Sequence, residues 1–304
     1  MPKDVFIDPF TDFGFKKLFG EEESKEALID FLNQFLPTHD QIHSLEYGKN
    51  EHLPRTEEDR IAIFDLLCTN QDNKKFIIEL QRAKQTFLVD RSIYYLSFLL
   101  QEQGKKGPDW NYELQTVYSI NILQFQLKEK AFPKRQLIHY AQISHAISGK
   151  PITDKINFIY LEVPKFNKPL DELQSRQDKW LFLLKNLAKL DKRPPALRDR
   201  VFQRFFERAK IAKLPPKEAR NYQINLEKMG DYKNTIQHAK NEAREEGRVE
   251  GHKEGKVEGR EEGRVENQIL TAQNMYSKGF DYKTIADILN VKEKEVKKWL
   301  KSKG

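Results

Sequence analysis

Hydrophobic residues recur at three- and four-residue intervals in two segments of the N-terminal half. In residues 22–36 the apolar positions are Ala27, Leu28, Phe31, Leu32 and Phe35, and Pro37 follows them. In residues 86–103 they are Phe87, Ile93, Tyr94, Leu96, Phe98 and Leu99, on one broad face. This spacing predicts an amphipathic helix in each segment. Because proline cannot continue a helix, we expect the first one to end at Pro37.

Short runs rich in Ile, Val and Phe predict β-strands. RIAIFDLLCT and KKFIIELQ flank the polar NQDNKK, a pattern typical of a β-hairpin. LQTVYSINILQFQL and INFIYLEV predict two further strands. Beyond Pro169 the pattern is helical, over residues 170–190, 196–212 and 216–229. This order predicts an α/β or α+β core followed by a helical extension.

The C-terminal part contains two segments that differ in composition from the residues before them. Residues 246–263 repeat Glu-Gly every four positions. Each glycine costs a helix about 1 kcal/mol relative to alanine, which favours a polar linker or marginal helix over a glycine-faced assembly helix. Residues 267–304 regain apolar positions and predict a small helix-turn-helix-like module, in which Gly279 ends the first helix. Its last helix would turn basic residues toward phosphates, at Lys294, Lys297 and Lys298.

A protein-interaction module is the alternative for residues 267–304, because the last helix offers few side chains that read base edges. A second basic stretch lies upstream. Residues 185–220 hold twelve Lys or Arg against four Asp or Glu, in a 304-residue chain of formal net charge +7. The stretch predicts a phosphate-facing surface that includes Arg193, Arg200 and Arg204, and a solvated helix face is the alternative.

Hydropathy and cysteine content exclude some classes of protein. No apolar run approaches the ~20 residues of a membrane-spanning helix, and the N-terminus lacks the apolar stretch of a signal peptide. We therefore expect a cytoplasmic protein without a membrane partner. The single cysteine, Cys68, lies in an apolar run and is interpreted as a core residue.

Two acidic residues interrupt the apolar runs of the hairpin. If the hairpin turns symmetrically about Asp72, antiparallel pairing places Asp65 opposite Glu79, with Cβ atoms about 5 Å apart. A divalent cation would offset the repulsion of the two carboxylates, since Mg²⁺ prefers oxygen ligands. In that position it can lower the pKa of a coordinated water and neutralise charge on a phosphoryl oxygen. The alternatives are an exposed sheet edge, or ion pairs with Arg60, Lys75 or Arg82.

The order of these residues resembles a known signature. Asp65, followed fourteen positions later by Glu79-Leu80-Gln81, resembles the Asp…Glu-x-Lys motif of the PD-(D/E)XK nuclease superfamily, with Gln81 in the lysine position. The preceding FIIE and the N-terminal TDFGFKKLF are similar to the Rpn group of recombination-promoting nucleases and transposase-like proteins. The resemblance is densest over residues 8–125.

The resemblance implies a restriction-endonuclease-like mixed β-sheet flanked by helices, and cleavage of DNA that depends on Mg²⁺ or Mn²⁺. Asp65 and Glu79 would hold the metal, with the carbonyl of Leu80 as a third oxygen. Gln81 would orient the attacking water by hydrogen bonding, although it carries no charge. Asp12 is a candidate accessory acid or an exposed cap residue. Lys16 and Lys84 are candidates for the missing cation.

These observations predict four regions: a nuclease-like core (1–165), a basic helical extension (166–235), the Glu-Gly repeat (236–266) and the terminal module (267–304). The predicted function is a metal-dependent DNA endonuclease associated with recombination or mobile DNA. The alternative is a catalytically degenerate DNA-binding or assembly protein that acts through its helices and terminal module. Because cutting both strands commonly takes two sites, we expect a homodimer or a higher oligomer.

Overall fold

The computed structural model describes residues 5–49, 51–52, 62–104, 111–128 and 131–301. The chain divides into two compact units, residues 1–229 and residues 230–304. The division falls within one long helix, α6 (Pro216–Ser277). Each unit has a hydrophobic core of its own.

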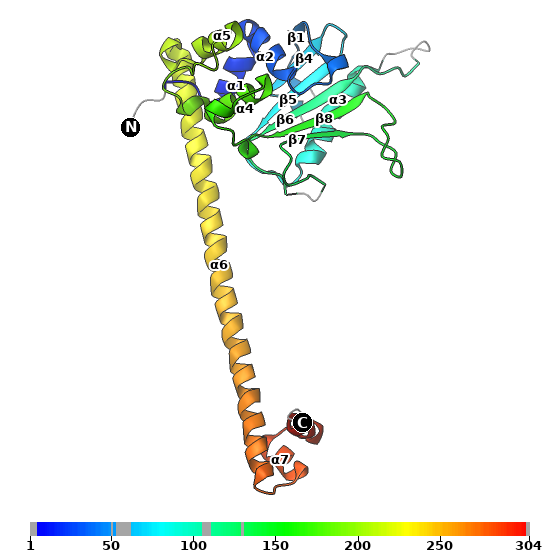
Figure 1. Cartoon of the computed structure of the whole chain (residues 1–304), viewed down its shortest axis with the longest axis vertical. Helices are drawn as coiled ribbons and strands as arrows, with labels where there is room; N and C mark the ends of the chain where they lie inside the picture. Colours follow the sequence, from blue (N-terminus) through cyan, green and yellow to red (C-terminus); the bar gives the residue numbers. More distant parts are fainter. Residues whose placement is uncertain (1–4, 50, 53–61, 105–110, 129–130, 302–304) are drawn as a thin grey trace. The chain divides into compact units, whose positions relative to one another are not determined.

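The first unit is built around a six-stranded sheet (Figure 1). Its strands are β1 (Leu45–Tyr47), β4 (Leu66–Asn70), β5 (Lys75–Gln81), β6 (Val117–Leu123), β7 (Ile138–Gln142) and β8 (Ile156–Glu162). The strand order is β1-β4-β5-β6-β8-β7, with β5, β6 and β8 parallel and the others antiparallel to their neighbours. A separate two-stranded sheet pairs β2 (Glu51–His52) with β3 (Ala62–Ile63). The mixed sheet confirms the predicted α/β fold.

The predicted hairpin is formed by β4 and β5. Leu66 pairs with Ile78 and Thr69 with Lys75, so the pairing is symmetric about Asp72, as predicted. The side chain of Asn70 shapes the turn, because its Oδ1 accepts hydrogen bonds from the backbone N–H groups of Asp72 (3.0 Å) and Lys74 (2.9 Å). One prediction is wrong: RIAIFDLLCT is not a single strand.

The chain bends at Asp65, between β3 and β4. The residues before the bend pair with β2 in the smaller sheet, and the residues after it join the main sheet. The strand is interrupted at Asp65 because the chain pairs with β2 before this residue and with β5 after it. Asp65 therefore sits at a corner of the chain, one residue before the β4–β5 ladder begins.

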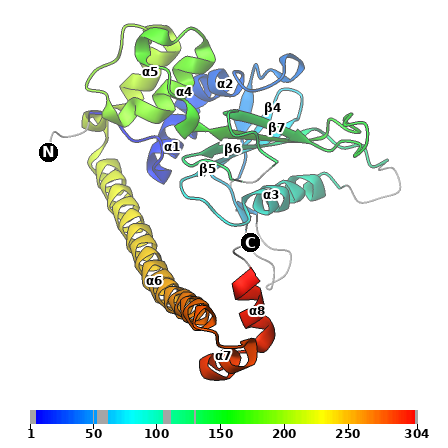
Figure 2. The same cartoon turned by 60° about the horizontal axis from the view of Figure 1, so that its bottom comes forward.

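Helices cover both faces of the main sheet. They are α1 (Asp12–Phe19), α2 (Lys25–Leu32), α3 (Leu88–Glu102), α4 (Arg176–Asn186) and α5 (Arg200–Ala209). Figure 2 shows α3 on one face and the other four on the opposite face. Because side chains alternate along a strand, β5 turns Ile77 toward α3 and turns Ile78 toward the other helices. Short 3₁₀ turns connect these elements, at Glu22–Ser24, Thr38–Asp40, Val163–Lys165, Leu170–Glu172, Leu187–Lys189 and Ile211–Lys213.

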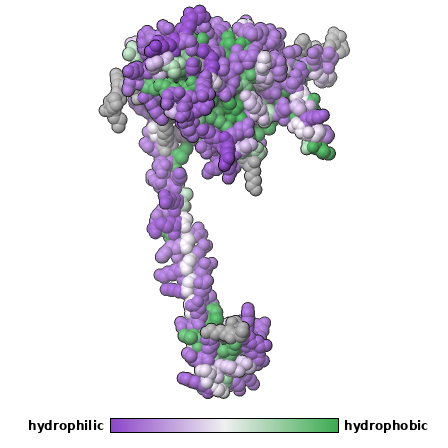
Figure 3. Space-filling view, in the orientation of Figure 1, coloured by the Kyte–Doolittle hydropathy of each residue, from purple (hydrophilic) through white to green (hydrophobic). Residues whose placement is uncertain are grey.

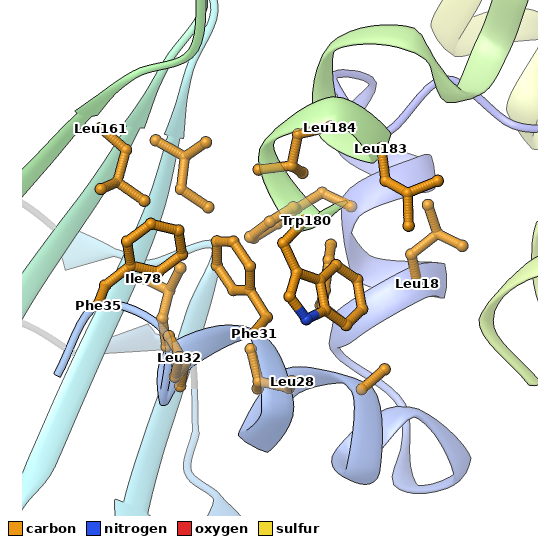
Figure 4. Close-up of a cluster of buried hydrophobic side chains, with 14 of the residues drawn as sticks. Leu18, Leu28, Phe31, Leu32, Phe35, Ile78, Leu161, Trp180, Leu183 and Leu184 are labelled. Atoms are coloured by element: carbon orange, nitrogen blue, oxygen red, sulfur yellow. The ribbon is translucent and has the colours of Figure 1, made fainter. Parts of the chain in front are cut away.

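The main core contains many aromatic residues and is continuous from the N-terminal helices to α5. Figure 4 shows the part of it around Trp180 of α4. Trp180 is fully buried, with ring centroids 5.8 Å from Phe31 and 5.1 Å from Phe205. Its indole N–H donates to a carboxylate oxygen of Asp30 at 3.2 Å, which satisfies the buried polar group. Packing thus continues across residue 165, where the sequence predicted a boundary, and α4 and α5 share the core of the sheet.

The helix predicted to end at Pro37 is shorter than expected. The α-helix ends at Leu32, and Asn33 is its C-cap. The Asn33 side chain donates to the carbonyl of Ile42 and accepts from the N–H of the same residue, both at 2.8 Å. This pair of bonds holds a separate turn in place, so the helix stops before proline is reached.

The helix predicted over residues 86–103 is present as α3, but its apolar face was misjudged. Leu96 and Leu99 are buried against the sheet, as the spacing indicates. Phe87, Ile93 and Tyr94 are instead exposed, at 69%, 52% and 46% of their surface. A helix on a sheet buries only one stripe, and these three residues lie outside it.

The second unit ends in the predicted cluster of three helices. The end of α6 packs with α7 (Tyr282–Leu289) and α8 (Glu293–Lys301) around Ala272, Ile285, Ala286 and Val296. Two left-handed residues allow the tight connections: Gly279 (φ 89°), which follows α6 as predicted, and Asn290 (φ 53°), the C-cap of α7.

The Glu-Gly repeat is helical and lies within α6. Its glycines form a pale stripe along the helix in Figure 3. Ion pairs between Arg248 and Glu245 (2.5 Å) and between Arg264 and Glu261 (2.6 Å) support the helix locally. Despite its length, α6 is too polar to cross a membrane, and the other helices in the described ranges do not qualify either.

Candidate functional site

The two acidic residues predicted to face each other are tied together by backbone hydrogen bonds. The N–H of Leu80, next to Glu79, donates to Oδ2 of Asp65 at 2.7 Å. In return, the N–H of Asp65 donates to Oε1 of Glu79 at 3.2 Å. The bend at Asp65 makes this exchange possible, because it frees that N–H from the strand ladder. Both carboxylates are thereby directed to one corner at the end of β5.

This corner disfavours two negative charges. Glu79 is only 3% exposed, and burial together with the charge of Asp65 raises its pKa to about 8. Burial also raises the pKa of Asp65, although the hydrogen bond from Leu80 opposes the shift. The protein alone therefore favours a proton on Glu79 near neutral pH. A bound cation would take the place of that proton.

Gln81 lies on the same face of β5 as Glu79. It is buried, and its side-chain amide donates to Oε2 of Glu79 at 3.2 Å. On the next strand, Asn121 is in register with Glu79 and accepts a hydrogen bond from Ser92 of α3 at 3.2 Å. The amide side chains of Gln81 and Asn121 thus extend the polar surroundings of Glu79 into the interface between the sheet and α3.

Arg91 of α3 is a site residue to which sequence reasoning gave no role. Its guanidinium lies 3.6 Å from Oε2 of Glu79, donates to Oε1 of Gln85 at 3.0 Å, and stacks 4.8 Å from the ring centre of Tyr95. Its Nε is buried and has no hydrogen-bond partner among the residues that the structure describes. Arg91 thus brings a positive charge to Glu79, with one donor still unused.

The other candidate cations belong to other elements. Lys16 pairs with Asp12 at 3.1 Å within α1. The charges of both residues act on Asp65, Asp12 raising and Lys16 lowering the pKa of its carboxyl. The cap of α1 is Thr11, whose hydroxyl accepts from the N–H of Gly14 at 2.9 Å. Lys84 lies on the exposed segment between β5 and α3.

The basic residues considered as neutralising partners of Asp65 and Glu79 do not all belong to this corner. Lys75 pairs with Glu102 of α3 at 2.7 Å. Arg82 is exposed just beyond β5, and Arg60 lies outside the described residues. Arg91, which is not among these predicted partners, contacts Glu79 at 3.6 Å.

The donor set suits a hard divalent cation. Mg²⁺ sites in proteins typically use one or two carboxylates, and the raised pKa of Glu79 indicates a need for positive charge. Within the described ranges, no third acidic, histidine or cysteine side chain completes a cluster with this pair. That composition fits Mg²⁺ or Mn²⁺ with retained waters better than zinc, which takes three or four protein ligands.

The predicted phosphate-binding residues of the first unit are engaged in ion pairs. Arg200 and Arg204 of α5 contact the two oxygens of Glu26, at 2.5 and 2.6 Å. Arg208 pairs with Glu21 and Glu23. Acidic residues of the N-terminal helices thus offset much of the positive charge of α5. Arg193 lies half-buried in the connection before α5.

The lysines of the terminal module remain at the surface. Lys294 and Lys298 are exposed on α8. Lys297 pairs with Glu293 at 2.6 Å and lies 5.7 Å from the ring centre of Tyr282. The helix therefore presents positive charge, part of it already matched by its own glutamate.

Comparisons with known proteins give one result. Neither a search of curated proteins nor a search of solved structures found a match. A protein-family comparison, by contrast, matches residues 9–239 to the family described as PD-(D/E)XK nuclease family transposase. The match spans the whole sheet, both acidic residues and the flanking helices. Since it covers more than half of the chain, this protein belongs to the PD-(D/E)XK nuclease family transposases, a nuclease family linked to mobile DNA.

Proposed function

We propose that this protein is a metal-dependent DNA endonuclease that hydrolyses phosphodiester bonds at the corner formed by Asp65 and Glu79. One observation carries the proposal. Two largely buried carboxylates are held side by side, and the pKa of Glu79 is raised to about 8. Such an arrangement costs stability unless a cation binds it, and perturbed acids of this kind concentrate at functional sites.

Each residue at this corner has its own role in the proposed reaction. Asp65 and Glu79 bind Mg²⁺ or Mn²⁺, with the carbonyl of Leu80 as a further ligand. When bound, the cation neutralises charge on a phosphoryl oxygen and makes a nearby water more acidic. Gln81 orients the water through its amide, and Arg91 supplies the positive charge that the superfamily's lysine would carry.

The experiment is cleavage of supercoiled plasmid with Mg²⁺ or Mn²⁺. Asp65→Asn and Glu79→Gln keep the size of each side chain and remove its charge, so each should lower activity by about 10²- to 10⁴-fold. Glu26→Gln is the matched control, since Glu26 is an ion-paired carboxylate on the opposite face of the sheet. Parental activity in both site variants would contradict the proposal, provided that circular dichroism shows all three to be folded.

A degenerate DNA-binding or assembly protein is the second candidate, and the uncharged Gln81 favours it. In that case the terminal module of α7 and α8 would carry the function. Removing residues 268–304 should then change DNA affinity or oligomeric state, as measured by fluorescence anisotropy and sedimentation. If the truncated chain keeps both properties and still cuts plasmid, this second candidate fails. Sedimentation of the full chain also tests the proposed homodimer.

A further inference from the structure

A pocket with exposed aromatic walls lies beside the carboxylates. It has a volume of about 610 Å³ and is lined by Phe87, Tyr94 and Tyr95 together with Arg91. Phe87 and Tyr94 are 69% and 46% exposed, although both are large apolar side chains. The volume is in the range of ligand pockets, which are typically 300–1,000 Å³. These aromatic residues do not contribute to the main core.

Arg91 forms a wall shared by this pocket and the carboxylate corner. One of its nitrogens faces Glu79 at 3.6 Å, another donates to Gln85 at 3.0 Å, and its plane covers Tyr95. Gln85 and Tyr95 both line the pocket. The guanidinium of Arg91 would therefore lie between a group bound in the pocket and the proposed cleavage position.

The lining favours a planar, uncharged, hydrogen-bonding group over a phosphate. Asp90 also lines the pocket and is exposed, so its negative charge offsets that of Arg91 there and repels a phosphate. A nucleobase has no such penalty. Its ring can stack on the aromatic walls, and its amino groups can donate to the oxygens of Asp90 or Gln85.

We propose that this pocket binds an unpaired nucleobase adjacent to the phosphate that is cut. A base within a continuous duplex is stacked on its neighbours and cannot enter a side pocket. The preferred DNA is therefore single-stranded, frayed or mismatched at the cut position. The cleavage part of this inference rests on the proposed function, whereas base binding can be measured without cleavage.

The test uses the full chain and a ten-nucleotide single strand that carries one 2-aminopurine, with Ca²⁺ present and the strand checked to be uncut. The variants are Phe87→Ala and Tyr94→Ala. Tyr140→Ala, at a tyrosine 59% exposed on β7, is the matched control. Stacking on an aromatic side chain is worth about 1–3 kcal/mol per base, so each pocket variant should weaken single-strand binding by roughly 5- to 150-fold. Fluorescence quenching of the base should decrease in parallel.

Binding to a fully paired duplex distinguishes a loss of base recognition from a general loss of structure or DNA affinity. The pocket variants should bind a fully paired duplex within twofold of the parent, and Tyr140→Ala should match the parent on both substrates. Unchanged single-strand affinity, or an equal loss on duplex, would overturn the inference. So would sedimentation showing that Phe87→Ala dissociates an oligomer while DNA binding is retained, because the surface would then belong to a second copy.

The two proposals fail in different ways. If Asp65→Asn cuts plasmid like the parent, the proposed function fails, and the 2-aminopurine result still decides whether the pocket binds bases. If Asp65→Asn is inactive while Phe87→Ala and Tyr94→Ala bind single strands normally, only the pocket inference fails.

Discussion

Two carboxylates on opposite faces of the sheet, Glu26 and Glu79, have opposite electrostatic environments. On the face covered by α5, Glu26 contacts Arg200 and Arg204, and the hydrogen bond from Arg200 lowers its pKa below the ordinary value. On the face covered by α3, burial and a neighbouring acid raise the pKa of Glu79 to about 8. The first carboxylate is stabilised as an anion, and the second is destabilised.

This difference separates structural charge from functional charge. On the face covered by α5, Glu26 contacts two arginines, so its charge is matched within the protein. At the corner on the other face, burial raises the pKa of both Asp65 and Glu79, and Glu79 contacts Arg91 at the longer distance of 3.6 Å. An arrangement that costs stability in the free protein is expected where a ligand supplies the missing charge.

The largest difference between the faces should appear in the pH dependence of stability. In metal-free protein, Glu79 keeps its proton to about pH 8 when folded and to about pH 4.5 when unfolded. The free energy of unfolding should therefore fall as pH rises from about 4.5 to about 8. Glu79→Gln removes this penalty and should stabilise the protein at pH 8 by up to a few kcal/mol, measured by urea unfolding.

Glu26→Gln gives the opposite sign and serves as the control. The pKa of Glu26 is lowered, so its contribution to stability is present above about pH 4.5 and is lost as pH falls. Its replacement should destabilise the protein at pH 8 by less than about 1 kcal/mol, since the pair is solvent-exposed. A stability change of the same sign in both variants would show that the two faces do not differ in this way.

Replacing Arg91 should have the next largest effect on the difference between the two faces of the sheet. Arg91→Ala should lower nuclease activity by roughly 10- to 100-fold, because a charge-assisted contact is worth about 1.5–3 kcal/mol. Since Arg91 lowers the pKa of Glu79, its removal should also move the rising limb of the pH–rate profile to higher pH. Arg91→Lys should restore part of both effects.

The matched variant for Arg91 is Arg204→Ala on α5, which should leave the pH–rate profile in place. A loss of activity in Arg91→Ala without any displacement of that profile would assign Arg91 to packing on Tyr95 rather than to the electrostatics of the corner.

The smallest effect should come from the ion pairs of α5. Replacing both Arg200 and Arg204 with alanine should lower the free energy of unfolding by less than about 1 kcal/mol. The difference should disappear at 1 M salt, where the Debye length is about 3 Å. Chemical denaturation at low and high salt measures this. A loss that persists at high salt would indicate packing rather than charge.

Local patterns in the sequence predicted much of the fold. The polar turn at Asp72 fixed the register of β4 and β5, so the approach of Asp65 to Glu79 followed from counting residues. The apolar runs gave β6 and β8, whereas β1 and β7 were missed. The first is only three residues long, and the second buries a histidine, His139, where a strand usually buries an apolar residue.

The remaining features depend on how distant segments meet. The bend at Asp65 follows from a change of pairing partner, which residue spacing does not reveal. Arg91 reaches Glu79 because the segment after β5 returns α3 across the sheet. Phe87 and Tyr94 belong to residue types that are usually buried, and only the orientation of α3 shows that they are exposed. Glycine propensity likewise left open whether the repeat is helical, and in the structure it lies within α6.

Isothermal titration calorimetry of the metal-free protein with Mg²⁺ measures the proposed metal site itself. Binding should be saturable at pH 7, with a heat that varies with the ionisation enthalpy of the buffer because Glu79 releases its proton. Asp65→Asn and Glu79→Gln should lose this binding, and Glu26→Gln should keep it. Equal binding in all four proteins, or none in the parent with either Mg²⁺ or Mn²⁺, would contradict a metal site at this corner.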